Sequence, residues 1–155
     1  MRARAKNWPQ DWQLRLIQLL AIPGLIVAFY LLLFHSGELN GACSVSGWDD
    51  CGQVSGPNAP YSAIGPVPVA LIGLVGYSIL FLLTWLNGWH TRLNDVMPEL
   101  LVALTALAFV FSLGLTALEI FVLQAICRYC IISAVLVTAM FALSVSYLRS
   151  QSWTE

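Results

Sequence analysis

Charged residues are scarce in this sequence of 155 residues. Lys and Arg number 7, Asp and Glu number 8, and together they make up 10% of the chain, against roughly 25% in an ordinary soluble domain. Hydrophobic residues make up 59% of the chain, and its mean hydropathy is +0.78. This composition excludes a soluble globular domain and indicates a protein embedded in membrane lipid. The net charge of −1 gives no basis for nucleic-acid binding or for a polybasic lipid-binding patch.

Four long apolar segments account for nearly the whole chain. A helix needs roughly 20 apolar residues to cross the hydrocarbon core of a bilayer, and each segment is about that long. We therefore predict an all-α membrane protein, a single four-helix transmembrane bundle over residues 1–155 with a long outward-facing loop at 35–65. The expected helices span residues 14–34, 66–86, 97–122 and 126–147.

The loop at 35–65 lacks Lys and Arg altogether and carries only acidic charges, at Glu38, Asp49 and Asp50. Basic residues are instead found near the opposite ends of the expected helices, at Arg2, Arg4, Lys6, Arg15, Arg92 and Arg149. Because Lys and Arg are enriched on the cytoplasmic side of membrane proteins, we expect both termini in the cytoplasm and the loop on the other side. Arg128, at the outer end of the last helix, goes against this pattern.

Cysteine is also rare, with 4 copies in the chain. In the expected topology all of them lie on the outward side, where disulfides persist. Cys43 and Cys51 fall in a loop rich in Gly, Ser, Pro, Asn and Asp, which we expect to be irregular and mobile. This pair by itself is compatible with a structural clip or with a disulfide that opens readily.

The second cysteine pair lies in the stretch "CRYCIIS", residues 127–133, where the last apolar segment begins. Cys127 and Cys130 are one helical turn apart near an expected helix N-terminus, where unpaired amides and the helix dipole stabilise a thiolate. Arg128 adds a positive charge beside both sulfurs. Because the thiolate is the reactive form, this setting favours redox exchange over a static disulfide.

Metal binding by the cysteines is disfavoured. Zinc usually takes four Cys or His ligands, and the chain has 2 histidines, of which His90 is expected on the cytoplasmic side. A c-type haem site requires His directly after the second cysteine of the motif, where this sequence has Ile131. We therefore expect no metal site.

Glu119 stands about two helical turns before Cys127, in the third apolar segment. An ionisable side chain at membrane depth is costly and is by default a candidate functional residue. The alternative is that the third helix ends early and Glu119 reaches water at the outer surface. The sequence leaves both interpretations open.

Two stretches give the sequence a family resemblance. "FVLQAICRYCIISA" and "DCGQV…APYSAIGPVPVALIGLVGY" are similar to the bacterial vitamin K epoxide reductase family, and the likeness covers roughly residues 14–148. The order of the cysteines is specific: a loop pair comes between the first two helices, and CxxC opens the fourth. The DsbB family does the same work with the order reversed, so the sequence does not fit it.

The resemblance implies a fold and an activity. Members enclose a quinone in a four-helix bundle in the bacterial inner membrane, so we expect a thiol:quinone oxidoreductase that supports disulfide formation. Cys43 is expected to exchange with a periplasmic thioredoxin-fold (DsbA-like) partner, Cys51 to pair with Cys127, and Cys130 to lie against the quinone, either ubiquinone or menaquinone. Many bacterial members are fused to a thioredoxin-like domain, and this chain stops at Glu155, so we expect a separate partner protein. We also expect the enzyme to be a monomer.

The resemblance also indicates which residues line the quinone site. The animal enzymes contact the vitamin K ring through an asparagine and a tyrosine, and the matching positions here are Val69 and Ala134. Neither side chain forms hydrogen bonds, which favours plain quinone reduction over reduction of a vitamin K-type epoxide. Tyr77 is a third candidate contact, although helix packing is its more common role. Three alternatives remain. Electrons could flow in the opposite direction or to a quinone epoxide of the vitamin K type. The protein could instead be a structural membrane subunit with static disulfides, or three or four of its thiolates could bind a metal ion.

Overall fold

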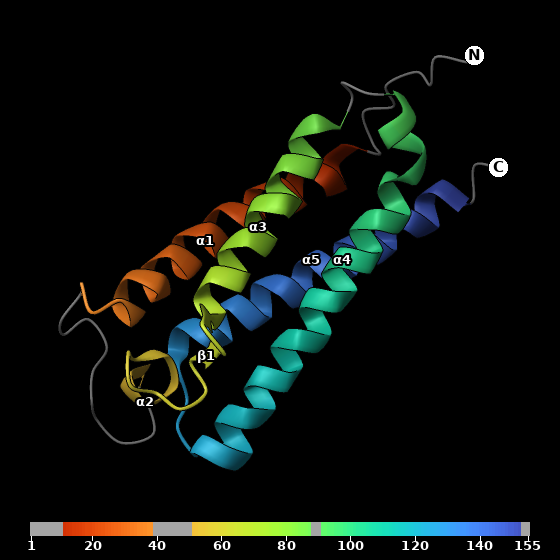
Figure 1. Ribbon diagram of the computed structural model, residues 1–155. Coiled ribbons are helices and arrows are strands. Elements are labelled where there is room, and N and C mark those ends of the chain that lie inside the picture. Colours follow the sequence, from red (N-terminus) through yellow and green to blue (C-terminus); the bar gives the residue numbers. More distant parts are fainter. Residues whose placement is uncertain (1–10, 39–50, 88–90, 153–155) are drawn as a thin grey trace.

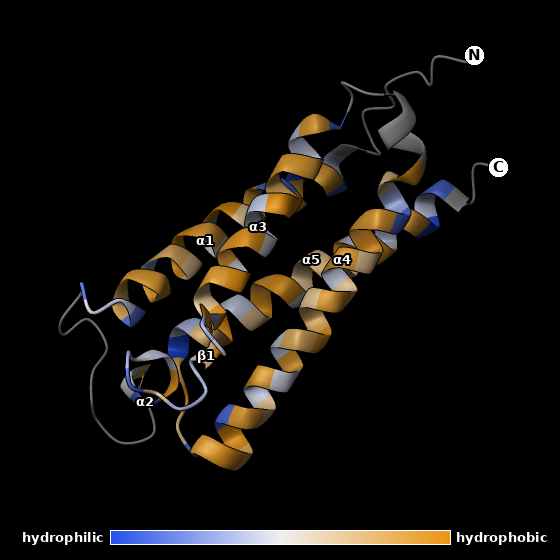
Figure 2. Cartoon of the chain, viewed as in Figure 1, coloured by the Kyte–Doolittle hydropathy of each residue, from blue (hydrophilic) through white to orange (hydrophobic). Residues whose placement is uncertain are grey.

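Four long helices form the molecule in a computed structural model that describes residues 11–38, 51–87 and 91–152. They are α1 (Asp11–His35), α3 (Val69–Leu86), α4 (Thr91–Leu118) and α5 (Arg128–Ser152). At the end of α4 the chain continues into a π-helix, η1 (Glu119–Leu123). All four helices are long and apolar enough to cross a membrane (Figure 2), as a multi-pass membrane bundle requires.

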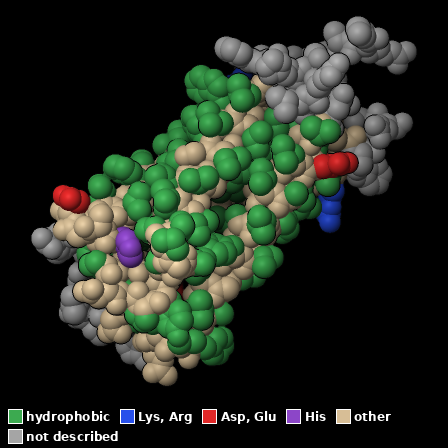
Figure 3. Space-filling model, viewed as in Figure 1, with side chains coloured by type: hydrophobic (Ala, Val, Ile, Leu, Met, Phe, Trp, Pro, Cys, Tyr) green, Lys and Arg blue, Asp and Glu red, His purple; other side chains and the backbone are tan. Residues whose placement is uncertain are grey.

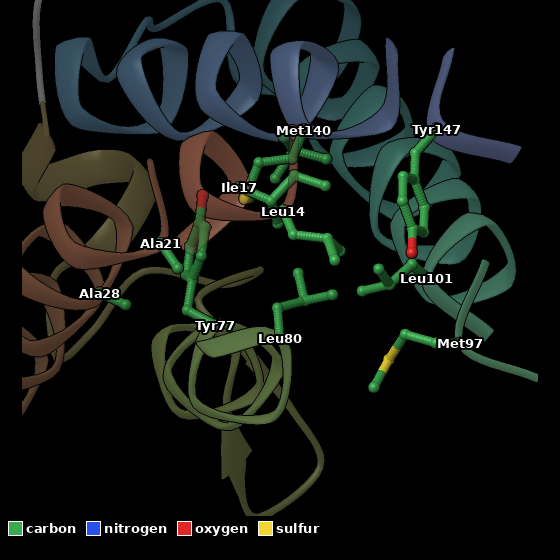
Figure 4. Packing of buried hydrophobic residues seen from close by; sticks show 11 residues of the cluster. Leu14, Ile17, Ala21, Ala28, Tyr77, Leu80, Met97, Leu101, Met140 and Tyr147 are labelled. Atoms are coloured by element: carbon green, nitrogen blue, oxygen red, sulfur yellow. The ribbon is translucent and has the colours of Figure 1, made fainter. Parts of the chain in front are cut away.

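The helices pack as two pairs. α1 lies against α3, α4 lies against α5, and α1 also packs against α5, which joins the pairs (Figure 1). Figure 4 shows the core between them, where side chains from all four helices meet. The buried cluster consists of Leu14, Ile17, Ala21, Ala28, Tyr77, Leu80, Met97, Leu101, Val137, Met140 and Tyr147.

Large apolar side chains also cover the outside of the bundle. Phe121 is 80% exposed and Leu107 is 69% exposed, and Figure 3 shows apolar side chains along the face in view, with the visible charged groups near its two ends. Such a surface is unfavourable in water and suited to hydrocarbon. The surface therefore agrees with the composition in indicating a membrane protein.

One end of the bundle gathers α2 (Cys51–Ser55), a short β-hairpin, η1 and the first turn of α5 (Figure 1). We call it the cysteine end, because Cys51, Cys127 and Cys130 all lie there. In the hairpin, β1 (Ala63–Ile64) pairs antiparallel with β2 (Val67–Pro68). The turn between the strands contains Gly65, whose φ of +63° favours glycine.

The predicted helices are confirmed, with shifted ends. The second was expected from residue 66 but begins at Val69, because a residue that precedes proline is held in extended conformation and Pro68 thus keeps Val67 out of the helix. The third begins earlier than expected, at Thr91, and ends in η1. The fourth begins at Arg128, two residues later than expected, and ends at Ser152.

The prediction of an irregular loop was wrong for part of residues 35–65. Cys51–Ser55 is helical because Cys51 and Val54, three residues apart, share one face that is buried against Leu31 of α1 and Ala125 beyond η1. This packing links residues far apart in the sequence, which composition does not reveal. Residues 39–50, with Cys43, lie outside the described residues.

A glycine allows α1 to approach α3 closely. Tyr77 of α3 packs its ring directly on Gly24 of α1, and its hydroxyl group lies 2.8 Å from the Ser133 hydroxyl of α5. Figure 4 shows the Tyr77 ring extending from α3 toward α1. A side chain at Gly24 would overlap this ring, which the hydrogen bond to α5 holds in place.

The substitution Gly24→Ala tests this packing. The added methyl group forces the Tyr77 ring to move, and overpacking of this kind costs about 1–3 kcal/mol. We expect a lower midpoint of thermal unfolding for the detergent-solubilised protein. Gly76→Ala is the matched control, since a methyl group there has open space around it, and an equal loss of stability in both variants would contradict this account.

Candidate redox site

Cys127 occupies the N-cap position of α5. It directly precedes the first helical residue, Arg128, and its carbonyl oxygen accepts the first helical hydrogen bond, from the Ile131 N–H at 3.1 Å. Its sulfur accepts hydrogen bonds from the main-chain N–H groups of Tyr129 and Cys130. An N-cap side chain characteristically binds these second and third amides of the helix. Here the capping atom is a sulfur, and the side chain is fully buried.

The helix α2 brings Cys51 to the same place. Cys51 is 1% exposed and belongs to a buried cluster with Leu31, Val54, Ala125 and Cys127. Its thiol is hydrogen-bonded with the Cys127 sulfur. The structure thus places a loop cysteine in contact with the first cysteine of CxxC, across 76 positions of sequence.

Cys130 lies in the first turn of α5 and is half-buried. Its thiol is hydrogen-bonded with Cys127 and also with the side chain of Glu119. The Ser55 hydroxyl oxygen of α2 is 3.9 Å from its sulfur. No disulfide joins the three sulfurs that the structure describes, Cys51, Cys127 and Cys130, so thiol contacts alone connect them.

Glu119 is buried beside the cysteines, with 4% of its surface exposed. One of its carboxylate oxygens, Oε2, accepts a hydrogen bond from the Cys127 N–H at 3.3 Å. The alternative in which Glu119 reaches surface water is therefore wrong. Burial is compatible with the other interpretation, in which Glu119 is a functional residue.

The backbone between η1 and α5 makes this contact possible. Glu119 starts the π-helix, and its carbonyl oxygen accepts hydrogen bonds from the N–H groups of Gln124 and Ala125. Gln124 has a φ of +50°, in the left-handed region, and turns the chain back toward Glu119. Single π-helical turns occur frequently at functional sites. The reversal brings Cys127 to Glu119, eight residues earlier in the sequence.

These contacts set the charge of Cys127, which lies between the spanning segments of α4 and α5. The hydrogen bond from the Cys130 thiol holds the pKa of Cys127 below the ordinary thiol range. Burial opposes this effect, while the two helical amides and the Cys51 thiol strengthen it. The sequence predicted that a helix N-terminus stabilises a thiolate in the CxxC motif. In the structure the amides of the helix N-terminus contact Cys127, so Cys127 is the cysteine whose thiolate they stabilise. Arg128, expected to contribute, has an exposed side chain.

The structure also places the candidate quinone contacts. Val69 is the first residue of α3, and its N–H donates to the Ser62 carbonyl oxygen at 2.9 Å. Tyr77 is buried in α3 and bonded to Ser133, which lies one turn beyond Cys130 in α5, directly before Ala134. No group of three His, Cys, Asp or Glu within residues 11–38, 51–87 and 91–152 is arranged to hold a metal ion. Cys43 lies outside these ranges.

Sequence reasoning missed two serines of this region. Ser55 contacts Cys130, and Ser133 binds the Tyr77 hydroxyl. A signal for each exists in the spacing: Ser55 is four residues after Cys51, and Ser133 is three residues after Cys130, so each shares a helix face with a cysteine. Serine is too common in helices and loops for this spacing alone to have singled them out.

The charge state of Cys127 can be tested by a substitution at its hydrogen-bond donor. Cys130→Ala removes the thiol that lowers the pKa of Cys127, so the thiolate should form only at higher pH. We expect the first thiolate transition, followed by ultraviolet absorbance of the reduced protein, to move upward in pH. Cys130→Ser, which keeps a hydroxyl donor, should shift it less. An unmoved first transition in Cys130→Ala would show that other groups control this thiol.

Comparison with known proteins agrees with the geometry. The sequence model of the vitamin K epoxide reductase family matches residues 15–145, which is most of the chain. A search among curated proteins finds no match. The family match, the four helices able to span a membrane and the buried thiols together indicate a membrane oxidoreductase. The chain therefore belongs to the vitamin K epoxide reductase family.

Proposed function

We propose that this protein is a membrane thiol:quinone oxidoreductase that oxidises a thioredoxin-fold (DsbA-like) partner and thereby supports disulfide-bond formation. The observation that carries the proposal is the position of Cys127 between two other thiols, Cys51 and Cys130. A cysteine with two sulfur neighbours can exchange one disulfide for another without movement of the helix bundle. That is the property an electron relay needs.

The relay begins at the loop pair. Two electrons from the reduced partner open the disulfide between Cys43 and Cys51 through a mixed disulfide, and the partner leaves oxidised. The Cys51 thiolate then attacks Cys127 of the Cys127–Cys130 disulfide. The bond between Cys127 and Cys130 breaks, and one between Cys51 and Cys127 forms. The contact between Cys51 and Cys127 supports this step, because attack requires the two sulfurs to meet.

The relay ends at the CxxC pair. When Cys43 re-forms its bond with Cys51, Cys127 is released and Cys127–Cys130 becomes a dithiol. A bound quinone supplies the oxidant, since it takes up the two electrons and two protons that this dithiol loses on becoming a disulfide. Cys130 is the better placed of the two to face the quinone, because it is half-buried while Cys127 is fully enclosed.

The candidate quinone contacts come from α3 and from the turn of α5 that follows Cys130. Tyr77 and Ser133 share one hydrogen bond between their hydroxyl groups, and the Tyr77 hydroxyl also lies 3.3 Å from the Ser133 carbonyl oxygen, to which it can donate. Ala134 and Val69 supply apolar surface without hydrogen-bonding side chains. Because neither matches the polar vitamin K contacts of the animal enzymes, the residue types at these two positions favour ubiquinone or menaquinone as the acceptor over a vitamin K-type epoxide.

A structural subunit with static disulfides is a weaker alternative. A static disulfide needs two cysteines, whereas here a third thiol and a buried carboxylate lie against the pair. Burial of an ionisable group costs free energy that a simple cross-link does not require. The charge pattern of the sequence further supports an orientation in the bacterial inner membrane with the cysteine end facing the periplasm and both termini in the cytoplasm.

Oriented membrane vesicles test both the activity and the orientation. Right-side-out vesicles that contain the protein, supplied with a reduced thioredoxin-fold protein and a short-chain ubiquinone or menaquinone, should bleach one quinone for each disulfide formed in the partner. Inside-out vesicles should not. Cys130→Ala should abolish bleaching, and Gly76→Ala should leave it unchanged.

Two results would overturn parts of this proposal. Wild-type vesicles of both orientations that bleach no quinone while the partner stays reduced would rule out the oxidoreductase activity. Bleaching confined to inside-out vesicles would reverse the orientation and leave the activity standing.

A further inference from the structure

Glu119 is a buried acid that the relay described above does not use. Its side chain is hydrogen-bonded with the Cys130 thiol, and its Oε2 accepts the Cys127 N–H at 3.3 Å. Both groups come from the N-terminus of α5, while Glu119 comes from the π-helix that follows α4. The carboxylate is therefore held against the reacting sulfurs by contacts across the junction of two elements.

The Cys130 thiol has one proton and two neighbours basic enough to remove it, since the hydroxyl group of Ser55, 3.9 Å from the sulfur, can share a hydrogen bond but is too weak a base to take the proton. One is the Cys127 sulfur, and the other is the Glu119 carboxylate. While Cys127 is a thiolate it competes for this proton. Once Cys127 is joined to Cys51 in a disulfide it is a poor acceptor, and Glu119 is then the acceptor within reach of Cys130.

We propose that Glu119 is a catalytic residue that takes up and returns the Cys130 proton as the disulfide moves between Cys51–Cys127 and Cys127–Cys130. This inference rests on the proposed relay, and it assigns the proton transfer that accompanies the exchange. The step requires no quinone and no partner protein. It therefore concerns the chain's own residues alone.

The exchange balances in atoms, electrons and charge. In one direction the Cys51 thiolate attacks Cys127, the Cys127–Cys130 bond breaks, and the leaving Cys130 sulfur takes the proton from the carboxylic acid of Glu119. The products are a Cys51–Cys127 disulfide, a Cys130 thiol and a Glu119 carboxylate. In the reverse direction the carboxylate removes the Cys130 proton, Cys130 attacks Cys127, and Cys51 leaves as a thiolate. No net oxidation occurs in either direction.

Burial of the site makes this proton transfer necessary, because water cannot stabilise a second negative charge there. Water has little access to Glu119, which is 4% exposed, or to Cys127, which is fully buried. A Cys130 thiolate formed next to a Glu119 carboxylate would place two negative charges together in this poorly solvated site. Transfer of the proton between the two groups keeps a single negative charge throughout the step.

The amide variant Glu119→Gln separates proton transfer from structural support. A glutamine side chain has nearly the same shape, and its oxygen still accepts the Cys127 N–H. It cannot take or return a proton. A purely structural role for Glu119 therefore predicts a small effect of this substitution, whereas the proposed role predicts a large one.

The experiment uses the full-length protein with Cys43→Ala and a single disulfide, in detergent without quinone or partner. A jump in pH shifts the balance between the two disulfide states. Rapid acid quenching, alkylation and mass spectrometry then report how fast free Cys51 and free Cys130 interconvert. General acid–base catalysis contributes factors of about 10²–10⁴, so we expect Glu119→Gln to slow the interconversion by about 100-fold.

Two further variants complete the test. Glu119→Asp, which keeps a carboxyl group on a shorter side chain, should interconvert faster than Glu119→Gln. Glu99→Gln makes the same chemical change at an exposed position of α4 and should match the wild-type rate. Thermal unfolding should show that all variants remain folded.

The outcomes separate this inference from the proposed function. An unchanged rate in Glu119→Gln, or equally slow rates in the Gln and Asp variants, would overturn the role of Glu119 and leave the relay intact. Failure of the parent protein to form both disulfide states would instead count against the relay itself.

Discussion

The contacts of the Cys127 sulfur are the interaction on which the rest of the site depends. This sulfur caps α5 through two main-chain amides, and it is hydrogen-bonded with the thiols of Cys51 and Cys130. The same atoms that stabilise the start of a membrane helix thus stabilise a thiolate. Cys127 is held at the start of α5 by its hydrogen bonds to the helix. It can therefore stay in place while its sulfur exchanges one cysteine partner for the other.

Burial of these groups needs support from both sides. On one side α2 packs Cys51 and Val54 against α1 and the start of α5. On the other side η1 and the left-handed residue Gln124 turn the chain so that Glu119 reaches the Cys127 amide. The apolar bundle holds these short elements together, and its outer surface is suited to hydrocarbon. The positions of the thiols therefore depend on the packing of the membrane helices.

The sequence predicted the features that depend on local composition. Four apolar runs predicted the spanning helices to within a few residues, and CxxC before the last run predicted a setting that favours a thiolate at the N-terminus of that helix. The helix at Cys51 and the contact of Glu119 with Cys127 could not be predicted, because each depends on packing between distant residues. Neither the π-helix nor Gln124 had a sequence signal. The family resemblance is confirmed, while the partner, the quinone, the orientation and the role of Cys43 stay predictions.

The central claim is that Cys127 can bond to Cys51 as well as to Cys130. Its most direct test is disulfide mapping by mass spectrometry of the oxidised Cys130→Ser protein, in which Cys127 has lost its CxxC partner. The account predicts a peptide pair joined by a Cys51–Cys127 disulfide as a major product. Recovery of Cys127 only as a thiol, with Cys51 joined to Cys43 in every molecule, would contradict it.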